Sequence, residues 1–187
     1  MILEIVKYAD PVLRQKGKPV GEITDEVRTL AADMIETMRV ANGVGLAAQQ
    51  VGIPMKLTVL EVEATEERPS TMTVDGRKVD LAAWMPMVLL DPVLELGKEK
   101  ETGSEGCLSF PEITADIERS IRVKANGRLL DGREIEFEAT GLLARALQHE
   151  TDHLNGILFI DRMNSATKIA LKGKLKRLQR GEGVGER

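Results

Sequence analysis

The sequence has 187 residues, of which 42% are hydrophobic, and a formal net charge of -4 at pH 7. A chain of this length can bury one sizeable core, so we expect a single compact soluble domain. The acidic balance argues against a general nucleic-acid-binding protein, and a lone cysteine excludes an intramolecular disulfide.

The N-terminus does not have the pattern of a secretory signal, because Glu4 and Lys7 occur before any apolar region of sufficient length. The longest apolar stretch, residues 81–90, is about half of the roughly 20 residues that a membrane span needs. We therefore expect a cytoplasmic protein with no membrane contact.

The first predicted helix covers about residues 25–41. Thr24 is a suitable N-cap, and the acidic residues of the first turn favour the positive end of the helix dipole. Apolar residues then recur at helical spacing, and Asn42 and Gly43 are typical of a helix end.

The central part of the chain is rich in short β-type runs, at residues 56–62, 87–96, 121–132 and 133–139. The dipeptides Asn126-Gly127 and Asp131-Gly132 predict turns of antiparallel hairpins. Residues 64–80 have the composition of a long surface loop, in which Asp75-Gly76 could form a small hairpin.

Two further helices are predicted, at about 140–154 and 165–179. The expected fold class is α+β, with mostly antiparallel strands packed around the central helix at 140–154 and with N-terminal and C-terminal helices. We assign residues 1–164 to one domain and residues 165–187 to a basic helix and tail of the same unit.

The helix at 140–154 contains both histidines of the chain, in the motif H-E-x-x-H. A separation of four residues places His149 and His153 on one helix face, where they can bind one metal ion. Histidines that serve only in packing are the alternative. Since catalytic metal sites usually have three protein ligands, a third must come from elsewhere.

Cys107 is the leading candidate for that ligand, because thiolates bind transition metals well. Its alternative role is that of a small buried hydrophobic residue. Glu150 aligns with leucines on the apolar side of the helix, where a carboxylate is costly without a partner. A water activated by the metal would be such a partner, and a solvated glutamate is the alternative.

The stretch GVGLAAQQ, residues 43–50, also matches the loose dinucleotide-binding pattern G-x-G-x-x-A. That pattern requires a preceding strand, whereas residues 25–41 have helical periodicity. We therefore reject nucleotide binding for this stretch.

Together, GVGLAAQQ, EGCLS and QHETDHLNG resemble, in this order, the three signature motifs of the peptide deformylase family. The resemblance covers most of the chain. It implies an enzyme that removes the formyl group from nascent peptides beginning with formylmethionine and releases formate.

The resemblance also implies a role for each matching residue. Cys107, His149 and His153 would bind one divalent metal ion, with Fe(II) as the metal in the cell and Zn(II) or Ni(II) able to replace it. Glu150 would be the general base and acid. The remaining matches are an oxyanion site at Gln50 and the backbone N–H of Leu108, peptide contacts at Gly45, and a loop shaped by Gly43.

The substrate pocket is predicted less directly. Val44, Leu108 and Leu142 are candidates for an apolar pocket for the methionine side chain, with core packing as the alternative. Arg145 lies one turn before His149 on the same helix face and could border that pocket, although many relatives have an apolar residue there. The stretch at 64–85 is longer than usual for the family.

Two other classes of protein remain as alternatives: an H-E-x-x-H metallopeptidase and a non-catalytic protein that binds peptide N-termini. A metallopeptidase usually takes its third ligand from beyond the helix, whereas Cys107 precedes it. The predicted partners are formylated nascent peptides, without sequence-specific nucleic-acid binding. Residues 168–180, with six basic and no acidic residues, could contact the ribosome. A solvated terminal helix is the alternative there.

Overall fold

The computed structural model describes residues 1–182. Its α-helices are α1 (Asp25–Val40), α2 (Gly141–Leu154) and α3 (Ser165–Gln179). The strands are β1 (Gly45–Ala47), β2 (Leu57–Leu60), β3 (Ser70–Val74), β4 (Arg77–Val79), β5 (Met87–Leu96), β6 (Lys100–Cys107), β7 (Phe110–Ser120), β8 (Arg122–Arg128) and β9 (Glu134–Thr140).

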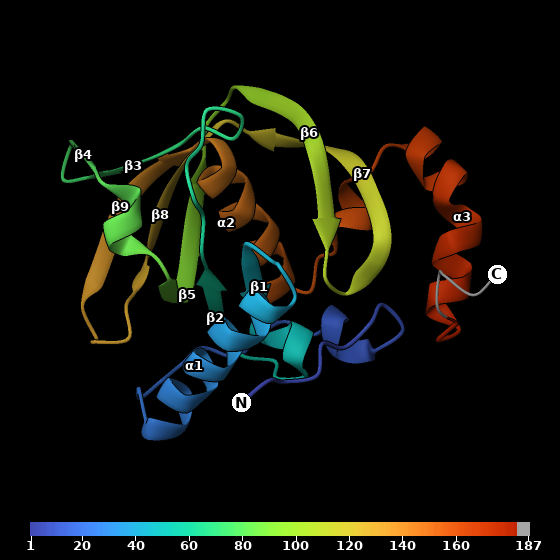
Figure 1. Cartoon of the computed structure of the whole chain (residues 1–187), viewed down its shortest axis with the longest axis horizontal. Coiled ribbons are helices and arrows are strands. Elements are labelled where there is room, and N and C mark those ends of the chain that lie inside the picture. The colour runs from blue at the N-terminus through green and yellow to red at the C-terminus, as the bar shows by residue number, and fades with distance from the viewer. Residues whose placement is uncertain (183–187) are drawn as a thin grey trace.

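Two antiparallel sheets flank the central helix. The larger has seven strands in the order β1-β2-β5-β8-β9-β3-β4, and the smaller is the pair β6-β7. Figure 1 shows α2 between the larger sheet and the β6-β7 pair, with α3 beyond β7. The predicted α+β class is therefore confirmed.

Local signals account for the helix boundaries. The Thr24 side chain accepts a hydrogen bond from the Val27 backbone at the start of α1. Just beyond its end, Asn42 has a φ of 54°, a left-handed conformation that asparagine tolerates better than most residues. At the end of α2, Gly156 has a φ of 73°. These ends agree with the boundaries expected from the sequence.

The strand predictions were correct in part. Asp131-Gly132 lies in the connection between β8 and β9, and Asp75-Gly76 joins β3 to β4, so the hairpin alternative for residues 64–80 is confirmed. The predicted turn at Asn126-Gly127 is wrong, because both residues lie within β8. Strands β6 and β7 were not predicted, although β7 alternates the apolar residues Ile113, Ala115 and Ile117 with polar ones.

Gly127 has a packing reason for its position in a strand. It lies where β8 crosses an irregularity of β5 between Leu90 and Val93. A Cβ atom on Gly127 would lie 2.8 Å from Leu89 Cδ1. The glycine therefore permits close approach of two strands and does not reverse the chain.

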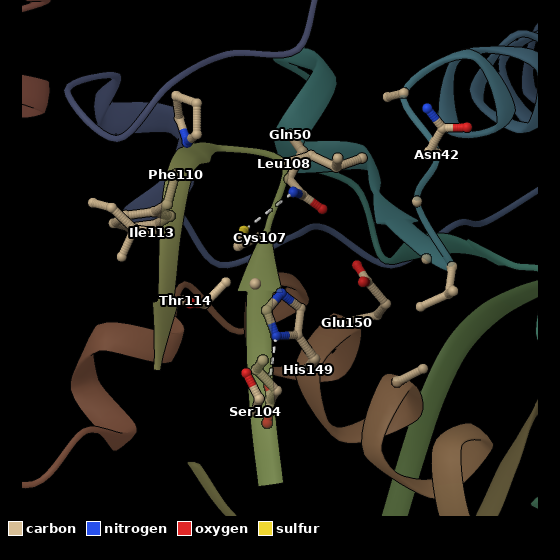
Figure 2. A pocket seen from close by; sticks show the side chains of 18 of the residues that line it. Asn42, Gln50, Ser104, Cys107, Leu108, Phe110, Ile113, Thr114, His149 and Glu150 are labelled. Atoms are coloured by element: carbon tan, nitrogen blue, oxygen red, sulfur yellow. Dashed lines mark hydrogen bonds and ion pairs between the residues drawn. The ribbon is translucent and has the colours of Figure 1, made fainter. Parts of the chain in front are cut away.

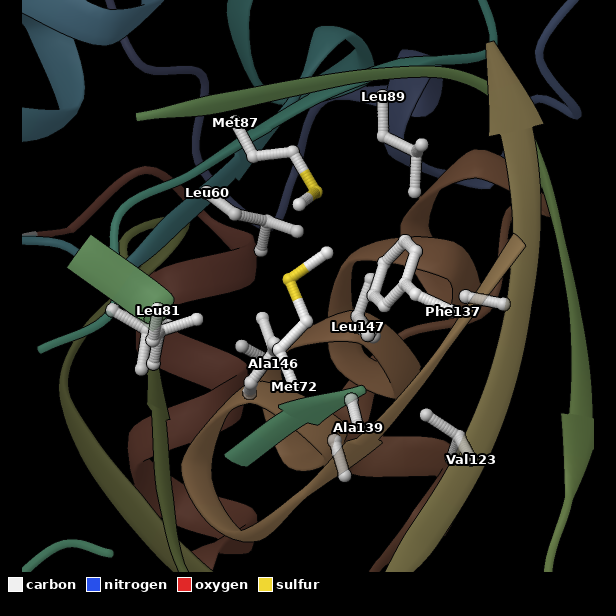
Figure 3. Packing of buried hydrophobic residues seen from close by; sticks show 14 of the residues in the cluster. Leu60, Met72, Leu81, Met87, Leu89, Val123, Phe137, Ala139, Ala146 and Leu147 are labelled. Carbon is white, nitrogen blue, oxygen red and sulfur yellow. The ribbon is translucent and has the colours of Figure 1, made fainter. Parts of the chain in front are cut away.

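The apolar side of α2 packs against the larger sheet. Leu143 and Leu147 are almost completely buried there, together with side chains of β3, β5 and β9 such as Met72, Leu89 and Phe137 (Figure 3). Burial of this cluster fixes the position of α2 relative to the sheet. The opposite side of the helix is left to face β6 and β7.

The C-terminal helix packs through one apolar stripe. Leu178 is buried, and Leu171 and Leu175 are partly buried against a cluster that includes residues of β7. The lysines of α3 are exposed. Residues 183–187 of the predicted tail lie outside the described part of the chain. Between residues 1 and 182, the structure contains no helix long and apolar enough to cross a membrane.

Candidate metal centre

Three side chains from two elements converge beside α2. Cys107 is the last residue of β6, and His149 and His153 lie one turn apart on α2. Figure 2 shows Cys107 and His149 facing one another, with Glu150 on the adjacent side of the helix. The structure thus brings together the three predicted ligands, although Cys107 and His149 are 42 positions apart in the sequence.

The spacing of the three donors suits one metal ion. Cys107 Sγ is 3.3 Å from His153 Nε2, which is 3.2 Å from His149 Nε2. All three donor atoms lie within 4.8 Å of one another. Imidazole nitrogens about 2.0–2.1 Å and a thiolate about 2.3 Å from a tetrahedral ion are separated from one another by about 3.3–3.6 Å. One thiolate and two imidazoles also match the donors that divalent transition metals prefer.

Glu105 fixes the orientation of the His149 ring. His149 Nδ1 is 2.8 Å from Glu105 Oε1, so an Nδ1–H donates there and leaves the Nε2 lone pair facing the other donors. Burial opposes ionisation of Glu105, but hydrogen bonds from His149 and Arg119 outweigh it and lower its pKa to about 2. Glu105 is therefore a charged acceptor at neutral pH.

The pKa values of the two histidines are shifted in opposite directions. Burial lowers the pKa of His149, but hydrogen bonds with Cys107 and Glu105 outweigh it and place that pKa well above its ordinary value. Burial, followed by repulsion from His149, lowers the pKa of His153. A metal ion must therefore compete with a proton for His149, as expected for a metal-binding imidazole.

Glu150 is a buried carboxylate that faces the cavity. The residue is 4% exposed, and its Oε2 atom has no hydrogen-bond partner among the described residues. Burial raises the pKa of Glu150 to about 7, despite the opposing field of His149. Such a group can exchange a proton with a reacting molecule near neutral pH.

Gly45 leaves the space that Glu150 occupies. A Cβ atom on Gly45 would lie 2.5 Å from Glu150 Oε1 and 2.8 Å from its Cγ, so any other residue would displace the carboxylate. Gly43 similarly leaves room for Leu108, whose Cδ1 would be 2.8 Å from such an added atom. Both glycines of the GVGLAAQQ motif are therefore required for packing, because a larger residue would displace the side chain of Glu150 or Leu108.

The Gln50 side chain is held in one orientation. Its Oε1 atom accepts a hydrogen bond from the Ala47 backbone at 3.0 Å. Its Nε2 atom consequently faces the site, 3.6 Å from Cys107 Sγ and 3.3 Å from Ser109 Oγ. The amide is a positioned donor beside the three candidate ligands (Figure 2).

The lining of one cavity includes Gln50, Cys107, His149 and Glu150. Its volume is about 560 Å³, within the range of roughly 300–1,000 Å³ that is common for small-molecule sites. Val44, Leu108 and Leu142 are in its wall. Arg68, from the segment before β3, also lines it, so the long 64–85 stretch contributes to the cavity wall.

Arg145 lines the same cavity, but its guanidinium group turns toward β6 and β7. It joins a buried charge network with Glu105 and Arg119, and Arg119 also pairs with Asp152. The Glu105–Arg119 pair is buried, and Arg145 is part of the same network.

Sequence reasoning missed several residues of the cavity. Ala146 follows Leu142 by four residues and could have been found from helical periodicity. Lys7 carries no comparable signal, because it reaches the site only through the tertiary fold. Ser109 is the last residue of the EGCLS motif but was given no role, although its hydroxyl lies 3.3 Å from Gln50 Nε2. Lys7 Nζ donates to the Leu108 backbone carbonyl at 3.0 Å.

Comparisons with known proteins agree on one family. The family model for polypeptide deformylase matches residues 2–168. A peptide deformylase of Methylacidiphilum infernorum is 44% identical, over 98% of this chain and 96% of that protein. One from Opitutus terrae is 42% identical, over 95% of this chain and 93% of that protein.

Solved structures give the same result. The crystal structure of peptide deformylase from Thermus thermophilus has a TM-score of 0.80 and 34% identity, covering 96% of this chain and 99% of that chain. A peptide deformylase from Synechococcus elongatus in complex with actinonin has a TM-score of 0.79 and 37% identity, covering 97% of this chain and 87% of that chain.

Proposed function

The chain belongs to the polypeptide deformylase family, and from this we propose that its cavity hydrolyses the formyl group of formylmethionyl nascent peptides and releases formate. The observation that carries the proposal is the convergence of Cys107, His149 and His153 beside the buried Glu150.

Cys107, His149 and His153 would hold one divalent metal ion. Such an ion acts as a Lewis acid and makes hydroxide available near neutral pH. We propose Fe(II) as the ion in the cell, with Zn(II) or Ni(II) as possible replacements. The mixed thiolate and imidazole donors suit all three ions. Elemental analysis of protein purified without oxygen tests this assignment.

Glu150 would move the proton of the reaction. It accepts a proton as water attacks the formyl carbon and returns it to the amine that leaves, so the released peptide carries a free N-terminus. The pKa of about 7 supports both directions of transfer.

Gln50 Nε2 and the Leu108 backbone N–H would donate hydrogen bonds to the oxygen that becomes negative during attack. One preorganised donor of this kind contributes about 3–4 kcal/mol to transition-state stabilisation in other hydrolases. The fixed orientation of Gln50 supports this role because its amide needs no rearrangement.

Val44 and Leu142 would contact the methionine side chain, and the backbone at Gly43 and Gly45 would lie along the peptide. The apolar part of the cavity wall supports this placement. Arg145 would border the pocket through its aliphatic stem.

Formate release from a formyl-Met peptide tests the reaction, with acetyl-Met and unformylated peptides as controls. We expect formate only from the formylated peptide. Cleavage of internal peptide bonds without formate release would instead identify a peptidase.

We also propose that residues 165–187 belong to the same unit as residues 1–164, that the protein acts in the cytoplasm, and that α3 contacts the ribosome. The buried Leu178 supports the first point. The exposed lysines of α3 support the third, because phosphate contacts need accessible cations.

Removal of α3 would uncover Leu178, so charge neutralisation is the better test of ribosome contact. Replacing Lys172, Lys174 and Lys176 by Gln should weaken ribosome binding and its salt dependence, while formate release from short peptides stays unchanged. Equal ribosome binding by this variant would reject the contact.

A further inference from the structure

The three candidate ligands depend on the relative position of two elements. His149 and His153 move with α2, whereas Cys107 moves with the β6-β7 pair. The Cys107 backbone does not belong to the larger sheet that holds α2 through its apolar side. Another contact must therefore keep β6 and β7 in register with the polar side of the helix.

Arg145 makes such a contact with both strands. Its Nη1 donates to the backbone carbonyl of Ile117 in β7 at 2.9 Å, and its Nη2 donates to the carbonyl of Glu101 in β6 at 3.2 Å. Nη1 is also 2.9 Å from Glu105 Oε2. The planar fork of a guanidinium group can serve these three acceptors at once, which a lysine ammonium cannot do with the same geometry.

The strand leaves a space for this fork. A Cβ atom on Gly103 would lie 3.0 Å from Arg145 Nη2 and 3.1 Å from its Cζ. The Arg145 side chain itself is only 12% exposed. Both terminal nitrogens of its fork therefore donate to the β6-β7 pair.

Charge neutralisation alone does not require Arg145. Glu105 already receives two hydrogen bonds from Arg119, at 2.9 and 3.1 Å. What Arg145 adds is a connection from α2 to the main chain of both strands, four residues before His149. Gln148 also binds the main chain from α2, but only at Ser120, the last residue of β7.

We propose that Arg145 is a positioning residue that holds the strand carrying Cys107 against the helix carrying His149 and His153. It thereby sets the spacing of the three donors before the metal ion binds. The inference rests on the proposed metal centre and adds a determinant of how tightly that centre holds its ion.

Measuring both metal affinity and the stability of the metal-free protein distinguishes this positioning role from a merely structural one. Removing one partner of a buried ion pair usually destabilises a protein, because it leaves the other charge unpaired. Here Glu105 keeps its two hydrogen bonds from Arg119 when Arg145 is replaced, so the metal-free protein should lose little stability. Loss of a group that orients metal ligands weakens metal affinity by roughly 10- to 100-fold. Arg145→Met should therefore affect metal binding far more than the folding of the metal-free protein.

The test uses the full chain, stripped of metal and titrated with Co(II) against a chromophoric chelator. Arg145→Met should weaken Co(II) binding by roughly 10- to 100-fold and reduce the thiolate-to-cobalt absorption band. Arg145→Lys should recover only part of the affinity, because it restores the charge without the fork. The matched control is Arg122→Met, which removes an exposed arginine paired with Glu138 and should change neither quantity.

Gly103→Ala provides a second variant if Arg145→Met folds poorly. It keeps the charge of Arg145 but pushes its fork away from the strands, so it should weaken Co(II) binding in the same direction by a smaller factor. Wild-type affinity and an unchanged absorption band in both variants would overturn the proposal. So would a loss of thermal stability in the metal-free protein with no change in Co(II) affinity.

The proposed metal centre has its own control. Cys107→Ala should abolish the thiolate-to-cobalt band. If wild-type protein lacks that band, or if Cys107→Ala keeps it, the centre itself is wrong, and this result differs from a failure of Arg145 alone.

Discussion

The two sides of α2 hold the helix by different physical means. Toward the larger sheet, Leu143 and Leu147 are buried among apolar side chains. Toward β6 and β7, Arg145, His149 and Asp152 bind charged or polar groups through hydrogen bonds.

Apolar burial is strong but non-directional, so it stabilises the helix without setting individual atoms to a few tenths of an ångström. Charged hydrogen bonds add little net stability when buried, because desolvation offsets their attraction. They do, however, define direction and distance. We therefore expect substitutions on the apolar side to change mainly stability, and substitutions on the polar side to change mainly chemistry.

The largest effect is expected for Glu150→Gln. This variant keeps the three candidate ligands and removes the proton acceptor, so the rate of formate release should fall by roughly 10²- to 10⁴-fold. Elemental analysis should still find the metal. Cys107→Ala is the opposite case, in which metal is lost together with activity. Loss of metal from Glu150→Gln would contradict the division of roles between the two residues.

Phe137→Ala probes the apolar side. Phe137 is 2% exposed within the cluster beneath α2, and its truncation should lower the free energy of unfolding by roughly 3–5 kcal/mol. Denaturant unfolding measures this change. Val40→Ala, at a position 61% exposed, should change it by less than about 0.5 kcal/mol.

The rate per folded molecule of Phe137→Ala, measured well below its melting temperature, should stay near wild type. A large loss of rate in fully folded Phe137→Ala would show that the apolar side also tunes the chemistry.

Gln50→Ala removes a donor on the polar side. Because the oxyanion forms only during reaction, kcat should fall by roughly 10²- to 10³-fold with a smaller change in KM. Steady-state kinetics of formate release measure both constants. Gln15→Ala, at an exposed position, is the control. A change confined to KM would mean that Gln50 binds substrate without stabilising the transition state.

The smallest effect is expected at the edge of the fold, for Asp161→Asn. Burial opposes ionisation of Asp161, but the hydrogen bond from Arg14 outweighs it and lowers its pKa. A carboxyl group with a lowered pKa in the folded state contributes stability above its unfolded pKa of about 3.9, and this contribution is lost as pH falls through the folded value.

Both side chains of that pair are more than a third exposed, so the contribution should stay below about 1 kcal/mol. The free energy of unfolding of Asp161→Asn should equal that of wild type at pH 2 and be slightly lower at pH 6. If the two free energies of unfolding differ more at pH 2 than at pH 6, a group other than Asp161 controls the pH dependence of stability.

Local sequence was sufficient for the features that depend on a few neighbouring residues. Thr24 and Asn42 define the ends of α1 through capping and a left-handed residue. The spacing of His149 and His153 placed both on one helix face, since a helix has 3.6 residues per turn. The three motifs, in order, were also enough to indicate the family.

Strand pairing was less predictable. β6 is rich in glycine and charged residues and has no apolar alternation, so only its pairing with β7 makes it a strand. Asn126-Gly127 has the composition of a turn, yet it lies in β8. Gly127 packs there against Leu89 of β5, a strand that is far away in the sequence but adjacent in the sheet. Whether such a segment forms a strand depends on contacts with residues far away in the sequence, which local residue preferences do not reflect.

The sequence by itself determined the chemical inventory of this protein: one thiol, two imidazoles one helical turn apart, and the glutamate between them. Only the tertiary structure decided that Cys107 lies 3.3 Å from His153, that Gly45 leaves space for Glu150, and that Arg145 turns toward the hairpin. The reason is that helix spacing is set by bonds between near neighbours, whereas these three contacts join segments between 28 and 105 residues apart. Their geometry follows from how the two sheets pack around α2, which no single segment specifies.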